Sequence, residues 1–218
     1  MKKKIDWLGY LIELVVVFIG ITAAFMLNNW RENFKDNQLE QKYLNSLFDD
    51  IVYDSQQLKI ILAANENKLN QAKRSIEILT TGDLATDSAA GLLASILTNY
   101  PFTPETSTYE SIKYSGNFNI LSDYELKEAL ILYYQSFEEA RFKEQIYNDY
   151  IHEYAIPFVY KNMDLLNQTI KTPTAVRGHT FNNLVVGYYA LFGQVIEMYQ
   201  VLVEMNQKLK KRLAEEIE

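Results

Sequence analysis

The chain has 218 residues, of which 48% are hydrophobic and 22% are charged, so it is long enough for one folded core and is unlike a disordered sequence. Its net charge of -7 argues against a nucleic-acid partner, and the absence of Cys excludes disulfides and thiolate metal sites. With only 8 Gly and 4 Pro it has too few turn residues for a many-stranded fold.

The first predicted element is a membrane-spanning helix. From Leu8 to Leu27 the chain runs for about 20 residues with a single ionisable side chain, the length that crosses about 30 Å of hydrocarbon. Trp7 and Trp30 flank this stretch and are expected near the two membrane interfaces. We therefore predict a transmembrane anchor at residues 1–30 and a soluble domain at residues 31–218.

A cleaved signal peptide would begin in a similar way. Here the apolar core is longer than the usual 7–15 residues of a signal peptide and contains Glu13, which favours an uncleaved signal anchor. Ala23 and Ala24 leave a cleavage site open.

Orientation follows from Lys and Arg alone. A tight lysine cluster at positions 2–4 precedes the span, and Arg31, Lys35 and Lys42 follow it. The cluster and the long acidic domain favour an N-terminus in the cytoplasm and a domain outside it.

Beyond the anchor the pattern becomes amphipathic, with a heptad stripe of the coiled-coil type. The stripe consists of Leu44, Phe48, Ile51, Ser55, Leu58, Leu62, Asn65, Leu69, Ala72, Ile76 and Leu79. The helix is predicted to continue from the membrane to about Thr81, where Gly82 can form a left-handed cap. Asn65 interrupts the stripe. A buried Asn at such a position can fix the register or the oligomeric state, or it can be satisfied by a neighbouring helix of the same chain.

Two short helices are predicted next. The first has Asp87 as a candidate N-cap and ends before two prolines. The second is expected from Tyr109 to Ser115, between a capping box of Ser107 and Glu110 and a terminal Gly116.

Two long helices complete the domain. A capping box of Ser122 and Glu125 opens a stripe that reaches Phe158, and Pro157 should bend this helix. The last helix carries a stripe from Leu184 to Leu209. The predicted fold is all-α: one transmembrane helix continuing into an extracytoplasmic antiparallel bundle with three long helices and short helical inserts.

The segment from Leu184 to Val203 is apolar enough to suggest a second membrane span, and the basic residues after it fit that topology. Gln194, Glu197, Gln200 and Glu204 make the segment amphipathic, which favours a helix of the bundle.

Several segments resemble a known family. Residues 12–21 read Ile-Glu-Leu-Val-Val-Val-Phe-Ile-Gly-Ile and residues 27–30 read Leu-Asn-Asn-Trp, while residues 107–116, 120–123 and Tyr133-Tyr134 supply a second signature. They resemble a family of uncharacterised membrane proteins common in Bacteroidota, although Ile12 stands where that family usually has glycine. The resemblance spans most of the chain. It implies an anchored helical protein of a Gram-negative envelope and no activity, because the family is a domain of unknown function.

Three residues of the span are candidates for a helix interface. A carboxyl group within hydrocarbon is costly, so Glu13 either contacts a partner in the membrane or is protonated or reaches the headgroups. Gly20 and Ala24 form a small-x-x-x-small pair that lets another helix approach, a pattern that is also frequent by chance.

No catalytic, cofactor-binding or metal-binding residue is predicted. His152 and His179 have no zinc spacing, and an exposed helix face accounts for Glu144 and Glu153 near His152. Tyrosines on the predicted helices suggest either a ligand cage or core packing, and several of them, including Tyr154, occupy stripe positions, which favours the core. They are Tyr133, Tyr134, Tyr147, Tyr150, Tyr154, Tyr188 and Tyr189.

We therefore expect a non-enzymatic interaction or scaffolding subunit in the inner (cytoplasmic) membrane, with its bundle in the periplasm. Its expected partners are membrane lipid and either a second copy or another integral membrane protein, without nucleic acid and without a cofactor. The alternative is a periplasmic ligand-sensing bundle that acts through a membrane partner. An enzyme is the third reading. The identity of a partner or ligand and the oligomeric state do not follow from the sequence.

Overall fold

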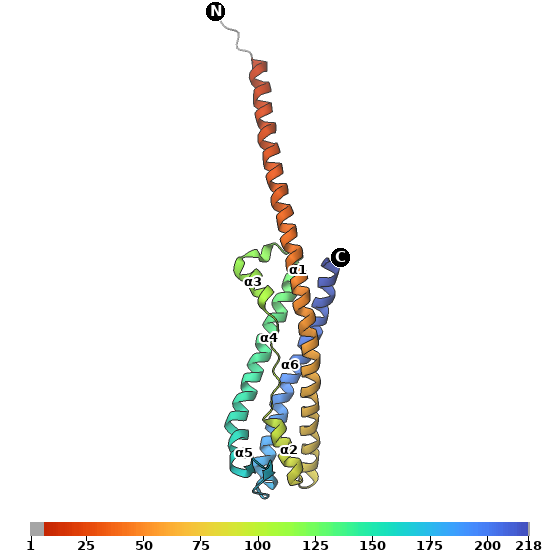
Figure 1. Ribbon diagram of the computed structural model, residues 1–218, viewed down its shortest axis with the longest axis vertical. Coiled ribbons are helices and arrows are strands. Elements are labelled where there is room, and N and C mark those ends of the chain that lie inside the picture. The colour runs from red at the N-terminus through yellow and green to blue at the C-terminus, as the bar shows by residue number, and fades with distance from the viewer. Residues whose placement is uncertain (1–6, 218) are drawn as a thin grey trace, which may run out of the picture.

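Three long helices dominate the computed structural model, which describes residues 7–217 (Figure 1). They are α1 (Trp7–Thr81), α4 (Tyr124–Tyr150) and α6 (His179–Ile217). The all-α bundle with short helical inserts and one long apolar N-terminal helix is confirmed. The lysine cluster predicted to set the orientation lies outside the described residues.

Helix α1 is one uninterrupted helix of 75 residues, about 110 Å long at 1.5 Å per residue. It contains no proline, so no backbone N–H is missing from its interior. Nearly all of its side chains between Leu8 and Gln38 are exposed, and burial against the bundle begins at Leu39. The predicted end at Thr81 is confirmed, but Gly82 is not left-handed: its N–H continues the helical pattern with a 2.9 Å bond to the Ile78 carbonyl.

Helix α6 packs against both α1 and α4 and forms the centre of the bundle. The space between α1 and α4 is filled by a segment that we call the 97–106 loop, together with α2 (Thr86–Ile96) and α3 (Ser107–Ser115) (Figure 1). The part of α6 that raised a second membrane span is packed inside the bundle, with side chains such as Val185 and Leu202 fully buried. Within residues 7–217, α1 is the one helix long and apolar enough to cross a membrane.

The caps of the two short helices differ from those predicted. Helix α2 is preceded by Ala85, and Asp87 lies in its first turn. Helix α3 begins at Ser107 itself, whose N–H donates to the Glu105 side chain at 3.2 Å, so the predicted capping box is wrong. Gly116 ends α3 with a φ of 75°, the left-handed cap that the sequence predicted.

Helix α4 begins one residue later than its predicted capping box implies. After the 3-10 turn η1 (Asn117–Asn119), the carboxylate of Asp123 accepts the Glu125 N–H at 2.9 Å, whereas the Ser122 N–H donates to Glu40 on α1. An ionised carboxylate is a stronger acceptor than a hydroxyl, which explains why Asp123 takes the cap.

The bend predicted at Pro157 takes the form of a π-helical turn. Helix α4 passes into η2 (Ile151–Ala155) and then into α5 (Ile156–Asn162), with Pro157 in the first turn of α5. Tyr154 lies in this turn with 51% of its surface exposed, so its predicted place on the apolar stripe is wrong. Antiparallel strands β1 (Met163–Asp164) and β2 (Thr169–Ile170) and the 3-10 turn η3 (Ala175–Arg177) lead into α6.

Candidate functional site

The apolar N-terminal stretch of α1, which is long enough to span a membrane, is the most conspicuous candidate surface. No residue of its most apolar 18-residue window is buried by the rest of the chain. Leu14 and Phe18 expose 67% and 70% of their surfaces. Such a surface is compatible with lipid or with another membrane helix, and its contact with water is unfavourable.

Glu13, Gly20 and Ala24 lie on one face of this span. At about 100° per residue, Glu13 and Ala24 project within about 40° of Gly20. All three are exposed, and a side chain built on Gly20 would meet no atom within 4 Å. The chain itself therefore leaves this face free for another molecule.

The two tryptophans predicted to lie near the membrane interfaces stand at the two ends of the apolar stretch. Trp30 is exposed and stacks on Phe34, with ring centroids 6.1 Å apart. Trp7 begins α1, but its side chain is outside the described part of the structure.

Inside the bundle, Asp54 of α1 is the centre of a buried polar cluster. Its side chain is fully buried and accepts the Glu105 N–H at 2.8 Å and the Tyr133 hydroxyl at 2.9 Å. Asn206 of α6 donates to the Ile51 carbonyl at 3.0 Å and lies 3.5 Å from the same hydroxyl. Burial raises the pKa of Asp54 from 3.8 to about 6. These contacts join α1, α4, α6 and the 97–106 loop.

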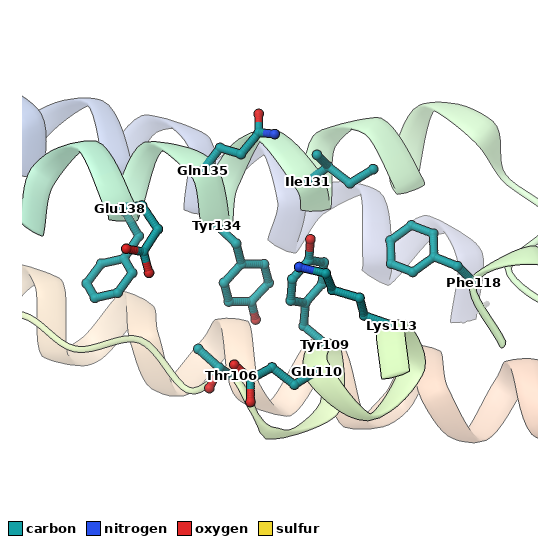
Figure 2. Close-up of a pocket in the computed structure, with 10 residues that line it drawn as sticks. Thr106, Tyr109, Glu110, Lys113, Phe118, Ile131, Tyr134, Gln135 and Glu138 are labelled. Atoms are coloured by element: carbon teal, nitrogen blue, oxygen red, sulfur yellow. The ribbon is translucent and has the colours of Figure 1, made fainter. Parts of the chain in front are cut away.

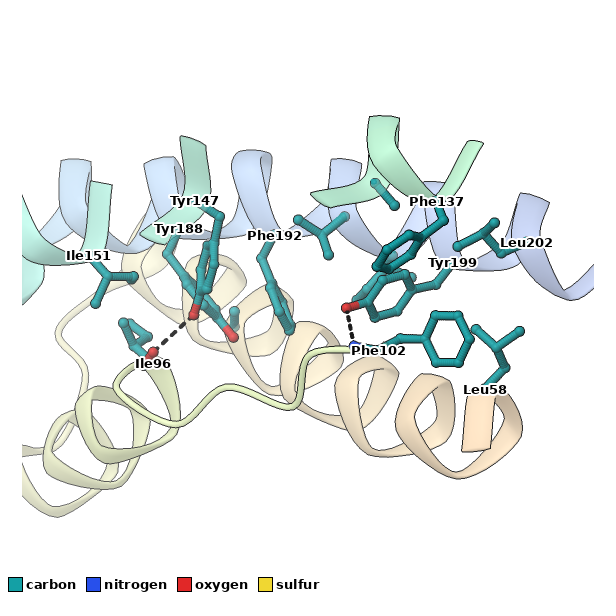
Figure 3. Close-up of a cluster of buried hydrophobic side chains, with 14 of the residues drawn as sticks. Leu58, Ile96, Phe102, Phe137, Tyr147, Ile151, Tyr188, Phe192, Tyr199 and Leu202 are labelled. Atoms are coloured by element: carbon teal, nitrogen blue, oxygen red, sulfur yellow. Dashed lines mark hydrogen bonds between the residues drawn. The ribbon is translucent and has the colours of Figure 1, made fainter. Parts of the chain in front are cut away.

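A second polar contact anchors the middle of the 97–106 loop (Figure 3). The Phe102 N–H donates to the Tyr199 hydroxyl at 2.8 Å, and this hydroxyl donates to the Glu144 carboxylate. The Phe102 ring is buried and meets Phe137 and Tyr199 edge to face, at centroid distances of 6.1 and 6.3 Å. The loop is thus a part of the core.

Glu144 corrects an expectation from the sequence. The sequence predicts an exposed face beside His152 for Glu144, but the Glu144 side chain is 8% exposed and burial raises its pKa. Its position explains the difference, because it follows Ala140 by four residues and precedes Tyr147 by three, which places it on the inward stripe. His152 and Glu153 are exposed as expected.

Asn65 and Lys68 hold the start of the same loop. The Asn65 side chain is fully buried and donates to the Tyr100 carbonyl at 3.0 Å, so its partner lies in the same chain. Lys68 donates to the Thr98 carbonyl and lies 5.0 Å from the Phe192 ring centroid. Burial lowers the pKa of Lys68 from 10.5 to about 8. Both side chains position the loop on α1.

Most of the tyrosines considered for a ligand cage pack in the core. Tyr133, Tyr134, Tyr147 and Tyr188 are buried, and Tyr147 donates to the Ile96 carbonyl at 3.0 Å (Figure 3). Tyr150 and Tyr189 are half-buried. The hydroxyl of Tyr188 is buried without a partner among the described residues.

A groove of about 480 Å³ lies between α3 and α4 (Figure 2). Its floor is the stacked pair Tyr109 and Tyr134, whose ring centroids are 4.1 Å apart. Glu110, Lys113 and Glu138 line its edges. The groove can accept a ligand, but no nucleophile and base are paired in it.

Metal chemistry finds no support in the part of the chain that the structure describes. No group of His, Asp and Glu side chains there could hold an ion. His152 and His179 are both exposed on the surface.

Comparison with known proteins returns one family. The model of a family of unknown function, DUF6090, matches residues 13–186, from the anchor into α6. No curated protein matches the chain, and no solved structure matches it.

Proposed function

Because the chain belongs to the DUF6090 family, whose function is unknown, we propose its function from its own architecture. It is a non-enzymatic interaction or scaffolding subunit of a bacterial envelope. Its N-terminus lies in the cytoplasm, α1 crosses the cytoplasmic membrane, and the bundle stands in the periplasm. The partner is a second copy or another integral membrane protein.

The observation that carries this proposal is the continuity of α1. The same helix supplies an uncovered membrane span and the first helix of the bundle, without a break between them. A partner that binds the span is therefore held at a fixed place relative to the bundle. This is what an assembly subunit needs, and it requires no reactive group.

Side chains on the bundle half of α1 extend the candidate interface. Tyr53 and Ile60 expose 53% and 64% of their surfaces. Counted at about 100° per residue from Gly20, they project within about 60° of it. Tyr53 and Ile60 are two separate apolar contact points for a parallel second copy of α1, because Arg31, Gln38 and Lys42 lie on the same face between them and the span.

Replacement of Gly20 by leucine is expected to lower the yield of oligomer or co-purifying partner. The added side chain keeps the two helix backbones apart where Gly20 and Ala24 let them approach. Glu13→Gln keeps hydrogen bonding and removes the charge. It lowers the yield only if the interface needs the ionised carboxylate, and a drop of about threefold is then expected, which corresponds to one membrane hydrogen bond of about 0.6 kcal/mol. Native mass measurement after gentle detergent extraction records both effects.

Val15→Leu is the matched control, because it adds bulk about 140° away from Gly20 on the same helix. Its assembly should equal that of the unchanged chain. If Gly20→Leu and Glu13→Gln assemble as well as Val15→Leu, the span is a plain tether and the proposed interface is wrong. Complete loss in Glu13→Gln would instead indicate a partner with an opposite charge.

The orientation has its own test. A reporter that is active only in the cytoplasm is expected to be silent when fused after Glu218, because the bundle stands outside. The same reporter fused before Met1 should be active. A strong signal from the C-terminal fusion would reverse the proposed topology.

Ligand sensing remains the second function, and the groove between α3 and α4 favours it (Figure 2). In this reading a bound molecule shifts the helices, and α1 carries the shift to a membrane partner. A chain that purifies as a lone monomer with an occupied groove would favour sensing over scaffolding.

A further inference from the structure

The π-helical turn lies at the end of the bundle remote from the anchor (Figure 1). A hollow of about 330 Å³ opens beside it. Its floor consists of Ile96, Tyr147, Ile151 and Val159, which are all buried. π-helical turns are rare and recur at functional sites, so this hollow is a candidate binding site.

The rim of the hollow offers hydrogen-bonding groups. The Asn99 amino group donates to the Asn148 carboxamide oxygen at 3.4 Å. Among the described residues, no protein group bonds the carboxamide oxygen of Asn99 or the amino group of Asn148. One acceptor and one donor therefore remain for a bound molecule.

The backbone adds a further acceptor. Because Pro157 has no N–H, a carbonyl in the preceding turn has no helical donor. The Ile151 carbonyl accepts the Ile156 N–H, so the carbonyl without a donor lies later in this turn, at or after His152, which lines the hollow.

The charge of the lining decides the class of ligand. None of the described residues around this hollow is Asp, Glu, Lys or Arg. The groove between α3 and α4 differs, because Glu110, Lys113 and Glu138 line it. A neighbouring hollow on the other side of Leu165 is lined in part by Asp87. Apart from the exposed imidazole of His152, the lining offers a charged ligand no opposite charge, so little of the cost of its desolvation would be offset.

Apolar side chains at the rim remain open to water. Leu97, Tyr160 and Leu165 expose 38%, 73% and 50% of their surfaces. A mainly apolar molecule in the hollow would remove part of this surface from water, which is favourable. The volume is near the lower end of the range for ligand sites, about 300–1,000 Å³, and so fits a small molecule.

We propose that this hollow binds a neutral, mainly apolar small molecule that carries a hydrogen-bonding group, such as an aromatic ring with an N–H or a hydroxyl. The binding site is independent of the interface on the membrane span. Its failure would leave the assembly proposal untouched.

Three molecules with one ring system test the charge preference. Indole is neutral, indole-3-acetate is an anion and tryptamine is a cation. The full chain in lipid nanodiscs should show saturable protection from hydrogen exchange at residues 147–160 with indole. Protection by the two ions should require concentrations about tenfold higher or more, because each would place a charge in an apolar hollow. Equal protection by all three, or none by indole up to its solubility limit, would overturn the proposal.

Paired variants locate the site. His152 lines this hollow but not the neighbouring one, Ala94 lines only the neighbouring one, and Leu166 lines neither. All three are exposed, so replacement by glutamate leaves the core intact. We expect His152→Glu to weaken the response to indole by about tenfold, while Ala94→Glu and Leu166→Glu leave it unchanged. Loss of the response in Ala94→Glu alone would move the site to the other hollow and contradict the proposal.

Discussion

Phe102→Ala is expected to destabilise the bundle by about 3–5 kcal/mol, the usual cost of removing a buried aromatic ring. The Phe102 ring is 1% exposed and lies against Phe137 and Tyr199, so its loss leaves a cavity in the centre of the core. The melting temperature of the full chain in a non-ionic detergent, followed by circular dichroism, should fall by roughly 6–20 °C.

The control for this variant is Phe142→Ala. Phe142 lies on α4 with 64% of its surface exposed, so the same chemical change there should alter the stability by less than about 0.5 kcal/mol. A similar, small effect of both substitutions would mean that the 97–106 loop is not packed into the bundle. The description of this loop as part of the core would then be wrong.

The stability of the bundle is expected to fall as the pH rises from 4 to 7. The pKa of Asp54 is about 6 in the folded chain and 3.8 in its ordinary environment. Between these values the folded state keeps a proton that the unfolded chain has released, so a rising pH favours unfolding. The difference corresponds to about 3 kcal/mol as an upper limit. Thermal unfolding at a series of pH values measures it.

Asp54→Asn removes this titration and keeps a side chain of similar shape. The variant should lose the part of the pH dependence of stability that Asp54 causes. The pKa values of Asp50 and Glu144 are also raised by burial, and they leave a slope of the same sign in both proteins. Lys68, with a pKa of about 8, stays mainly protonated over this range. Equal slopes in the two proteins would show that Asp54 does not titrate there.

Much of the fold could be predicted because it depends on periodic signals. The length and apolarity of residues 8–27 predict the span, and apolar stripes with spacings of three and four predict the three long helices. The ends of helices depend on one or two atoms. Competing acceptors such as Asp123 and Glu105 shift them by one or two residues, which is why two predicted capping boxes are wrong.

The buried polar residues were harder to predict. Asp54, Lys68 and Asn206 each lie next to a residue that the predicted stripe used instead, and Glu144 lies in the gap that the stripe left between Ala140 and Tyr147. Their partners are far away in the chain: Tyr133, for example, is 79 residues from Asp54. Periodicity can mark such a polar residue as inward, but only the tertiary fold shows which group satisfies it.

Because α1 is unbroken, the distance of the bundle from the span and its rotation about the axis of α1 change together. One residue added between the span and Leu39 would lift the bundle by about 1.5 Å and turn it by about 100° about the axis of α1. Seven added residues would lift it by about 10 Å and return it almost to its starting direction. The length of the exposed stretch after Trp30 therefore determines which side of the bundle faces a molecule bound to Gly20.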